Sequence, residues 1–182
     1  MKKLEFLENL EFILIFLAIF LPIRFFIFEP FVVIGESMEP NFHSTDYLII
    51  CKICTKLGGI NRGDVVIFKP PVDANKYYIK RVIGLPGERV YLKGNEIYIY
   101  NNQYPNGFKL EEDYLPDKNF YMEEQVFNLK NNEYFVLGDN REESYDSRKW
   151  GPLEESRIIG KVVLRINLLG RLIKVIHFNK TL

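Results

Sequence analysis

This sequence contains very little alanine and cysteine, and it has no excess of basic over acidic residues. Alanine occupies only positions 18 and 74 of 182; because it is the strongest helix former, a helix-rich domain is not expected. Two cysteines are too few for a disulfide framework or a four-thiolate zinc site. Lys plus Arg equals Asp plus Glu at 24 each, so the basic excess of a nucleic-acid-binding protein is missing. Aromatic residues are abundant instead, with 15 Phe and 11 Tyr, which favours β-strands.

The scarce histidines and cysteines also limit the chemistry. His43 lies only six residues from Ser37, too near to require tertiary positioning, and His177 lies in a basic apolar tail, so a Ser-His mechanism is disfavoured. Cys51 and Cys54 have CxxC spacing, but no second pair follows that would complete a metal site. Since positions i and i+3 of a strand face opposite sides, we expect two structural thiols; a redox role outside the cytoplasm is the alternative.

One long apolar run stands near the N-terminus. From Phe12 to Phe28, 17 residues, the only polar side chain is Arg24. This length is at the lower end of those that span a bilayer, so the run predicts an uncleaved transmembrane anchor. A cleavable signal peptide is disfavoured because no small-x-small site follows, and a buried core helix is a third interpretation. Lys2 and Lys3 precede the run, and after Arg24 no Lys or Arg appears before Lys52, which predicts a cytoplasmic N-terminus and an exported domain.

Beyond Pro30 the chain shows short β-rich runs separated by turn residues. The pattern predicts a mainly β protein, in which a single N-terminal transmembrane helix is followed by an antiparallel, partly closed β-sheet domain. The expected strands are Phe31–Ile34, Tyr47–Cys51, Asp64–Phe68, Tyr77–Gly84, Arg89–Lys93, Glu96–Tyr100, Glu133–Leu137 and Gly160–Ile166.

The predicted organisation is a cytoplasmic N-terminus (1–11), the anchor (12–28) and an exported domain (29–182). Residues 101–132 are poor in apolar periodicity, so we expect a small excursion from the sheet rather than a second core. Near the C-terminus, residues 168–178 place apolar side chains at helical spacing beside basic ones. This pattern predicts either a helix at the lipid interface or a final core strand with a helix packed on the sheet, and the second is favoured.

Three segments of the sequence contain side chains that could take part in catalysis. The first contains a possible nucleophile and the second a possible base. Ser37 lies in Gly35-Glu36-Ser37-Met38-Glu39-Pro40, a constrained turn that could expose its Oγ atom; an ordinary turn serine is the plain interpretation. Lys80 lies in a strand-like run, where a lysine would normally extend its ammonium group into water from a sheet edge. If Lys80 is buried among apolar neighbours instead, its pKa falls and it becomes a plausible general base.

The third segment, GDNREESYDSR at 138–148, directly follows an apolar strand; its plain interpretation is a surface loop with internal Asp–Arg pairs. Together and in this order, the segments resemble one family, the type I signal peptidases, which are membrane-anchored Ser/Lys proteases. GESMEP resembles the nucleophile box, Gly63-Asp64-Val65-Val66 a structural box, and YIKRVIGLPGE the lysine box. The third segment matches G-D-N-R-x-x-S-x-D-S-R at every fixed position. The resemblance extends from the anchor to about Ile166.

The resemblance implies a role for each matching residue. Ser37 would attack the scissile carbonyl, and the neutral amine of Lys80 would take its proton. The backbone N–H of Ser37 would be one oxyanion donor. Where many relatives carry a hydroxyl as second donor, this chain has Gly35. Ser144 would hydrogen-bond the lysine amine, and two pairs would hold the loop against the lysine strand: Asp146 with Arg148, and Asp139 with Arg81. No cofactor or metal is implied.

The resemblance also implies partners and a location. The substrates would be signal peptides of preproteins exported by a translocase, recognised by small side chains one and three residues before the cut. Phe31–Ile34 and the lysine strand are candidate walls for those pockets. The chain would cross a plasma or thylakoid membrane once, with its catalytic domain on the extracytoplasmic side. The dipeptide Trp150-Gly151 follows the third segment, and this continuation is similar to that of the cyanobacterial and plastid branch of the family.

Two other functions remain open at this point. A self-cleaving repressor-type Ser/Lys protease would share the catalytic logic, but it would need a DNA-binding module where this chain has its apolar run. A membrane-tethered, non-catalytic β-sheet binding domain would leave Ser37 and Lys80 as bystanders. The 49 residues between Glu88 and Gly138 further imply a small accessory region.

Overall fold

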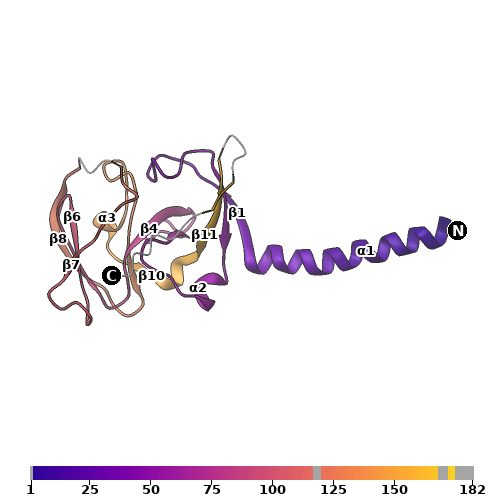
Figure 1. Cartoon of the computed structure of the whole chain (residues 1–182), viewed down its shortest axis with the longest axis horizontal. Helices are drawn as coiled ribbons and strands as arrows, with labels where there is room; N and C mark the ends of the chain where they lie inside the picture. Colours follow the sequence, from indigo (N-terminus) through magenta and orange to yellow (C-terminus); the bar gives the residue numbers. More distant parts are fainter. Residues whose placement is uncertain (1, 117–119, 168–171, 175–182) are drawn as a thin grey trace.

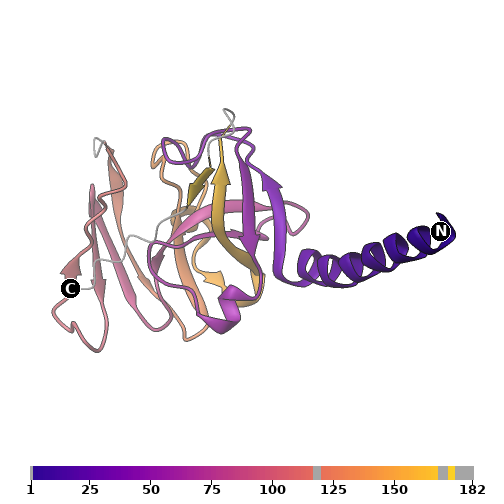
Figure 2. The same cartoon turned by 45° about the vertical axis from the view of Figure 1, so that its right-hand side comes forward.

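The structure, a computed structural model, describes residues 2–116, 120–167 and 172–174. A long N-terminal helix projects from a domain built of two antiparallel sheets (Figures 1 and 2). The domain contains little other helix: α2 (Cys54–Leu57), α3 (Ser147–Trp150) and the 3-10 turn η2 (Glu155–Arg157) are short. The expectation of a mainly β, antiparallel domain is confirmed.

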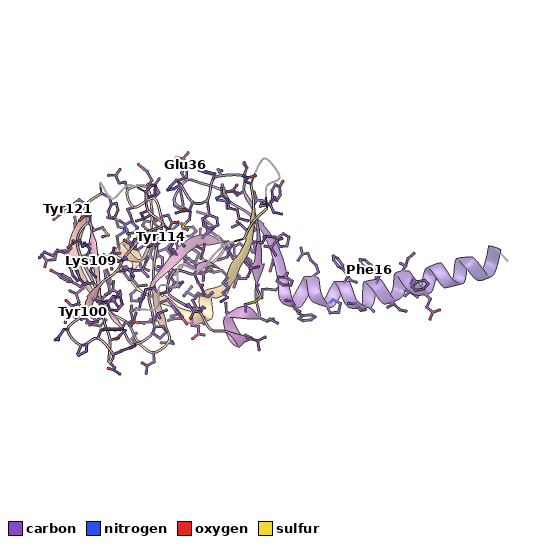
Figure 3. The ribbon with its side chains drawn as sticks, in the orientation of Figure 1. Phe16, Glu36, Tyr100, Lys109, Tyr114 and Tyr121 are labelled. Carbon is purple, nitrogen blue, oxygen red and sulfur yellow. A yellow bond between two sulfur atoms is a disulfide. The ribbon has the colours of Figure 1, made fainter. Side chains whose placement is uncertain are left out.

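The run expected to form the anchor is divided among three elements. Helix α1 (Lys2–Pro22) begins before the run, and the π-helical segment η1 (Ile23–Ile27) follows it. Strand β1 (Phe28–Val32) starts at the last residue of the run. The large apolar side chains of α1 between Leu10 and Leu21 are exposed, as at Phe16 in Figure 3. In the part of the chain that the structure describes, no helix combines the length and hydropathy needed to cross a membrane.

The first sheet has eight strands. Its order is β1-β2-β11-β3-β4-β9-β10, and β12 pairs additionally with β11. Strand β4 lies between β3 and β9, and six of its seven residues are buried. The remaining strands are β2 (Tyr47–Cys51), β3 (Val65–Phe68), β4 (Tyr78–Gly84), β9 (Glu133–Leu137), β10 (Leu153–Glu154), β11 (Ile158–Ile166) and β12 (Leu172–Lys174).

The second sheet has four strands in the order β7-β6-β5-β8. They are β5 (Arg89–Gly94), β6 (Glu96–Tyr100), β7 (Phe108–Lys109) and β8 (Met122–Asn128). The tight β5–β6 hairpin turns at Gly94, whose φ of +62° is one that glycine adopts without strain.

Residues 101–132 contribute to a second core, which the sequence did not predict. Val90, Leu92, Ile97 and Ile99 pack in one cluster with Tyr114, Leu115, Met122 and Leu129. The apolar periodicity of this segment is weak because β8 lies at the sheet edge and exposes Glu123 and Glu124. Strand β8 therefore depends on pairing with β5 rather than on its own apolar periodicity.

Strand boundaries otherwise agree closely with expectation. Three predicted strands coincide with β2, β6 and β9. The first strand lies at Phe28–Val32 rather than Phe31–Ile34, because β1 is an edge strand and tolerates Pro30 within it. Strands β7, β10 and β12 have only two or three residues, too few to give a periodic signal.

Two further expectations require correction. Cys51 and Cys54 form a disulfide with a Cα–Cα distance of 5.4 Å, because β2 ends at Cys51 and the chain turns into α2. The argument from opposite strand faces therefore did not apply. In the basic tail, Leu172–Lys174 form β12, antiparallel to β11, instead of a helix, since β11 offers backbone partners there. The other tail residues expected to be helical, 168–171 and 175–178, lie outside the described residues.

Candidate active site

Ser37 lies in the turn that leaves β1 and leads toward β2. Gly35 has a φ of +99°, and a Cβ atom there would meet nothing within 4 Å, so backbone conformation rather than space favours glycine. Met38 and Phe42 are only 1% and 3% exposed and fix the turn in the core of the first sheet. The backbone N–H of Asn140 donates to the carbonyl oxygen of Ser37 at 3.1 Å. The turn is thus attached both to the core and to the loop after β9.

Lys80 lies in the middle of β4, opposite Val66 of β3. It is 3% exposed, so it is a buried lysine and not an edge lysine. Its Nζ atom lies 2.7 Å from Ser37 Oγ, 2.9 Å from the carbonyl oxygen of Ile79 and 5.6 Å from the centre of the Tyr78 ring. The fold therefore brings the candidate nucleophile and the candidate base into hydrogen-bond contact.

Burial changes the acid–base properties of Lys80. Loss of solvation penalises the ammonium form and lowers the pKa of Lys80 from 10.5 to about 8. The carboxylates of Asp146 and Asp139 oppose this shift, and the guanidinium of Arg148 adds to it. Because the pKa lies near 8, the amine is neutral in a useful fraction of molecules close to neutral pH. A neutral amine 2.7 Å from a hydroxyl can accept its proton.

The loop at 138–148 is held by two ion pairs. Asp139 accepts hydrogen bonds from Arg81 Nε at 2.8 Å and Nη2 at 2.6 Å, and both side chains are almost completely buried. Asp146 pairs with Arg148 at 2.8 Å and accepts the backbone N–H of Gly138 at 3.0 Å. Since Arg81 follows Lys80 on β4, the first pair joins the loop to the lysine strand, as the resemblance implied.

Ser144 differs from what the resemblance implied. It is 8% exposed, and among the described residues its buried Oγ atom has no hydrogen-bond partner, so no bond to the Lys80 amine is present. The hydroxyl nevertheless lies close to the nucleophile turn. A Cβ atom at Gly138 would lie 2.2 Å from Ser144 Oγ and 2.3 Å from the carbonyl oxygen of Ser37.

A cleft of about 730 Å³ opens over the Ser37–Lys80 contact. Its walls are largely apolar and include the two segments expected to form them, the end of β1 with the following residues and the start of β4. An extended peptide could lie between these walls with its carbonyl group near Ser37. The lining residues are Phe31, Val32, Val33, Ile34, Gly35, Glu36, Ser37, Leu48, Ile67, Lys76, Tyr77, Tyr78, Ile79, Lys80, Glu143 and Tyr145.

The other candidates that the structure describes, His43 and the two cysteines, do not line this cleft. His43 is exposed and contacts Glu39 at 3.4 Å, and His177 lies outside the described residues. The Cys51–Cys54 disulfide joins β2 to α2. Across the described ranges, no three His, Cys, Asp or Glu side chains converge to hold a metal ion.

Three residues near the site, Asn41, Glu112 and Tyr114, were not predicted, and Arg141 was named only as part of the third segment, without a role. Asn41 and Tyr114 contact the Arg81–Asp139 pair, and Arg141 forms a buried ion pair with Glu112. Glu112 and Tyr114 come from residues 101–132, which the sequence analysis treated as an excursion. The acidic and aromatic character of that segment carried no positional signal, because its partners are far away in the sequence.

Comparison with known proteins decides the family. The family model described as signal peptidase, peptidase S26, matches residues 6–167, most of the chain. The chain belongs to this signal peptidase family. It is therefore an enzyme, a peptidase, and the non-catalytic binding domain is no longer favoured.

Individual signal peptidases show the extent of the similarity. The signal peptidase I of Bacillus amyloliquefaciens is 40% identical over 159 residues, covering 81% of this chain and 78% of the relative. That of Leptolyngbya laminosa is 36% identical over 179 residues, covering 91% and 83%. A crystal structure of a signal peptidase I from Enterococcus faecalis V583 is 33% identical and covers 56% of this chain and 95% of that chain, with a TM-score of 0.48. Since the Bacillus and Leptolyngbya signal peptidases are similarly related to this chain, the cyanobacterial and plastid branch is not singled out.

Proposed function

We propose that this enzyme removes N-terminal signal peptides from exported preproteins, with Ser37 as nucleophile and Lys80 as general base. The observation that carries the proposal is the 2.7 Å contact between Ser37 Oγ and a lysine amine whose pKa is lowered to about 8. The names of the related signal peptidases support the substrate class. No histidine base is needed for this chemistry.

The proposed reaction is an acyl transfer in two steps. Ser37 Oγ attacks the scissile carbonyl while its proton moves to the neutral Nζ of Lys80, and the backbone N–H of Ser37 donates to the oxyanion. The resulting ammonium then gives its proton to the leaving amine, and an ester to Ser37 remains. Water then attacks that ester while the neutral lysine takes one of its protons; as the bond between the carbonyl carbon and Ser37 Oγ breaks, the lysine ammonium gives this proton to Ser37 Oγ, and the free enzyme is restored.

Supporting roles follow from the contacts of the loop at 138–148. The Asp139–Arg81 pair would keep the loop against β4 and so keep the Ser37 turn in place, and the Asp146–Arg148 pair, which lies within the loop, would hold the shape of the loop itself. The buried hydroxyl of Ser144 would turn toward the Lys80 amine when substrate closes the cleft, since it has no other partner among the described residues. Gly35 lines the cleft and offers no side-chain hydroxyl to the oxyanion.

The proposed location is a plasma or thylakoid membrane, with the catalytic domain on the extracytoplasmic side. The exposed apolar side chains of α1, which projects away from the domain in Figure 1, would provide the attachment to the lipid bilayer. Alkaline washing of membranes from cells that carry the full chain, followed by protease treatment of membrane vesicles of known orientation, tests this placement. Release by the alkaline wash, or digestion of the domain from the cytoplasmic face of the membrane, would contradict it.

Preprotein processing by the Ser37→Ala variant tests the proposed chemistry. Processing should stop, because Ser37 Oγ is the hydroxyl in contact with Lys80 Nζ and, among the described residues, no second hydroxyl makes this contact. Ser44→Ala is the matched control, since Ser44 lies exposed in the same connection between β1 and β2. Wild-type processing by the Ser37→Ala variant would refute the nucleophile assignment.

Substrate variants test the proposed specificity. A preprotein with alanine one and three residues before the cut should be processed, and one with phenylalanine at either position should not. The apolar walls of the cleft would accept small side chains and exclude bulk by steric conflict. Equal rates for both substrates would contradict the proposed pockets.

A further inference from the structure

Asn41 makes contacts that no sequence motif pointed to. It lies four residues after Ser37, at the end of the same turn, and is half-buried. Its Nδ2 atom donates to Asp139 Oδ2 and to the backbone carbonyl of Tyr114, both at 2.9 Å. One amide group therefore joins the Ser37 turn to two segments that lie 73 and 98 residues further along the chain.

Asp139 is the group through which this contact reaches Lys80. Its carboxylate receives two hydrogen bonds from Arg81 and a third from Asn41. Arg81 directly follows Lys80 on β4, so its position also limits the position of Lys80. The same carboxylate thus holds the lysine strand on one side and the serine turn on the other.

Tyr114, whose carbonyl accepts from Asn41, is itself held in place by several contacts. The centre of its ring lies 4.1 Å from the guanidinium carbon of Arg81. Its hydroxyl donates to Glu112 and accepts a hydrogen bond from Arg141 Nη2 at 3.1 Å. Figure 3 labels Tyr114 inside the domain, whereas Tyr121, Lys109 and Tyr100 lie toward its far edge. The carbonyl that Asn41 contacts therefore belongs to a buried, hydrogen-bonded segment.

We propose that Asn41 is a positioning residue, which sets the distance between Ser37 and Lys80 by tying the serine turn to the Asp139 carboxylate and the Tyr114 carbonyl. The inference rests on the proposed function of Ser37 and Lys80. Asn41 itself does not touch the reacting atoms; it acts through the turn and through Asp139.

An asparagine suits this position because of its donors. Its side-chain amide offers two N–H groups to the two acceptors and adds no charge beside the Arg81–Asp139 pair. A threonine could satisfy only one of the two acceptors. An aspartate would offer no donor and would place a second carboxylate against Asp139. A leucine of similar size would leave both acceptors without this partner.

Steady-state kinetics on the full chain test the proposal, with a peptide that carries alanine three residues and one residue before the scissile bond. Asn41→Leu should lower kcat about 10- to 100-fold and change KM little, because misplacement of the reacting atoms affects the chemical step more than binding. Asn41→Thr should give an intermediate kcat. Hydrogen exchange of residues 36–42, whose Glu39 and Phe42 amides bond within the turn, should be faster in both variants.

Asn101→Leu is the matched control. Asn101 is also half-buried, and its Nδ2 atom donates at 2.9 Å to a carboxylate, Glu88, that is paired with an arginine, Arg62. It lies at the end of β6 in the second sheet, away from Ser37. This variant should have a lower melting temperature than the wild type. Its kcat, measured on the folded enzyme, and the hydrogen-exchange rate of residues 36–42 should equal those of the wild type.

Two outcomes would overturn the proposal. One is an unchanged kcat in Asn41→Leu and Asn41→Thr while Ser37→Ala is inactive, which would leave the proposed function intact. The other is that Asn41→Leu and Asn101→Leu lower kcat to the same extent while the exchange of residues 36–42 does not change, since the fall would then reflect a general loss of stability. If instead Ser37→Ala were active while exchange of the turn still depended on Asn41, the proposed function would be wrong and the anchoring of the turn would stand.

Discussion

The Nζ atom of Lys80 and the Oγ atom of Ser37 lie 2.7 Å apart, although 43 residues separate them in the chain. Strand β4 holds the lysine between two neighbouring strands, and Met38 and Phe42 hold the serine turn in the core of the same sheet. Lys80 is 3% exposed, so its amine has little access to bulk water as an alternative partner. This geometry makes the acid–base behaviour of Lys80 the most direct test of the enzyme.

The pH dependence of kcat/KM should show an acid limb near pH 8. Activity requires the neutral amine, and burial lowers the pKa of Lys80 to about 8, so activity should rise as pH increases through that value. A pH–rate profile on the peptide substrate measures the limb. Lys80→Arg should be inactive at every pH, because a guanidinium stays protonated. A limb near the ordinary lysine pKa of about 10.4 would exclude Lys80 as the base.

The same lysine should reduce the stability of the fold at neutral pH. The folded-state pKa lies below the unfolded value of 10.5, so between about pH 8 and 10.5 the unfolded chain binds more protons, and the free energy of unfolding rises with pH. Relative to Lys80→Met, the wild type should therefore gain roughly 3 kcal/mol across this window. Urea unfolding at pH 7 and pH 10.5 measures the difference. Parallel changes in the two proteins would show that the pKa of Lys80 is not depressed.

Gly138→Ala should damage both stability and activity. A Cβ atom there would lie 2.2 Å from Ser144 Oγ and 2.3 Å from the carbonyl oxygen of Ser37, so the serine turn would have to move. We expect a loss of about 1–3 kcal/mol and a lower kcat, measured by urea unfolding and peptide cleavage. Gly58→Ala is the control, because a Cβ atom there would approach only Cys54 O, at 3.5 Å. Equal behaviour of the two variants would argue against this steric account.

Removal of Asp139 should be strongly destabilising. Asp139→Ala leaves the Arg81 guanidinium, 3% exposed, without its charge partner, which we expect to cost about 3–5 kcal/mol. Lys130→Ala, which removes an exposed ammonium group from its pair with Glu133, should change the free energy of unfolding little, since Glu133 keeps its hydrogen bond from the Lys130 backbone N–H. Denaturant midpoints for the two variants provide the comparison. A small effect at Asp139 would mean that water reaches Arg81.

Much of the fold could be predicted from the sequence because its signals are local. Strands such as Tyr47–Cys51 and Glu96–Tyr100 combine β-branched or aromatic residues with turn residues at their ends, and the structure places them there. Strand β8 could not be predicted, because its exposed glutamates hide its pairing with β5. The disulfide was missed because the end of β2 at Cys51 depends on the turn that follows.

The site divides in the same way. Ser37, Lys80 and the loop at 138–148 could be named from the sequence, since their motifs are contiguous. Asn41 and Tyr114 could not, because each acts through a partner that lies far away in the chain. Nor could the state of Ser144 be predicted, as its buried hydroxyl has no partner among the described residues.

The sequence by itself determined the class of this protein: a β-rich domain after an apolar N-terminal run, with the motifs of a signal peptidase. Only the tertiary structure decided that Lys80 is buried, that its amine meets Ser37, and that the two partners of Asp139, Arg81 and Asn41, both contact Tyr114. The reason is physical. A motif specifies which groups are present, but a lowered lysine pKa and a 2.7 Å contact arise from desolvation and packing by residues distant in the sequence.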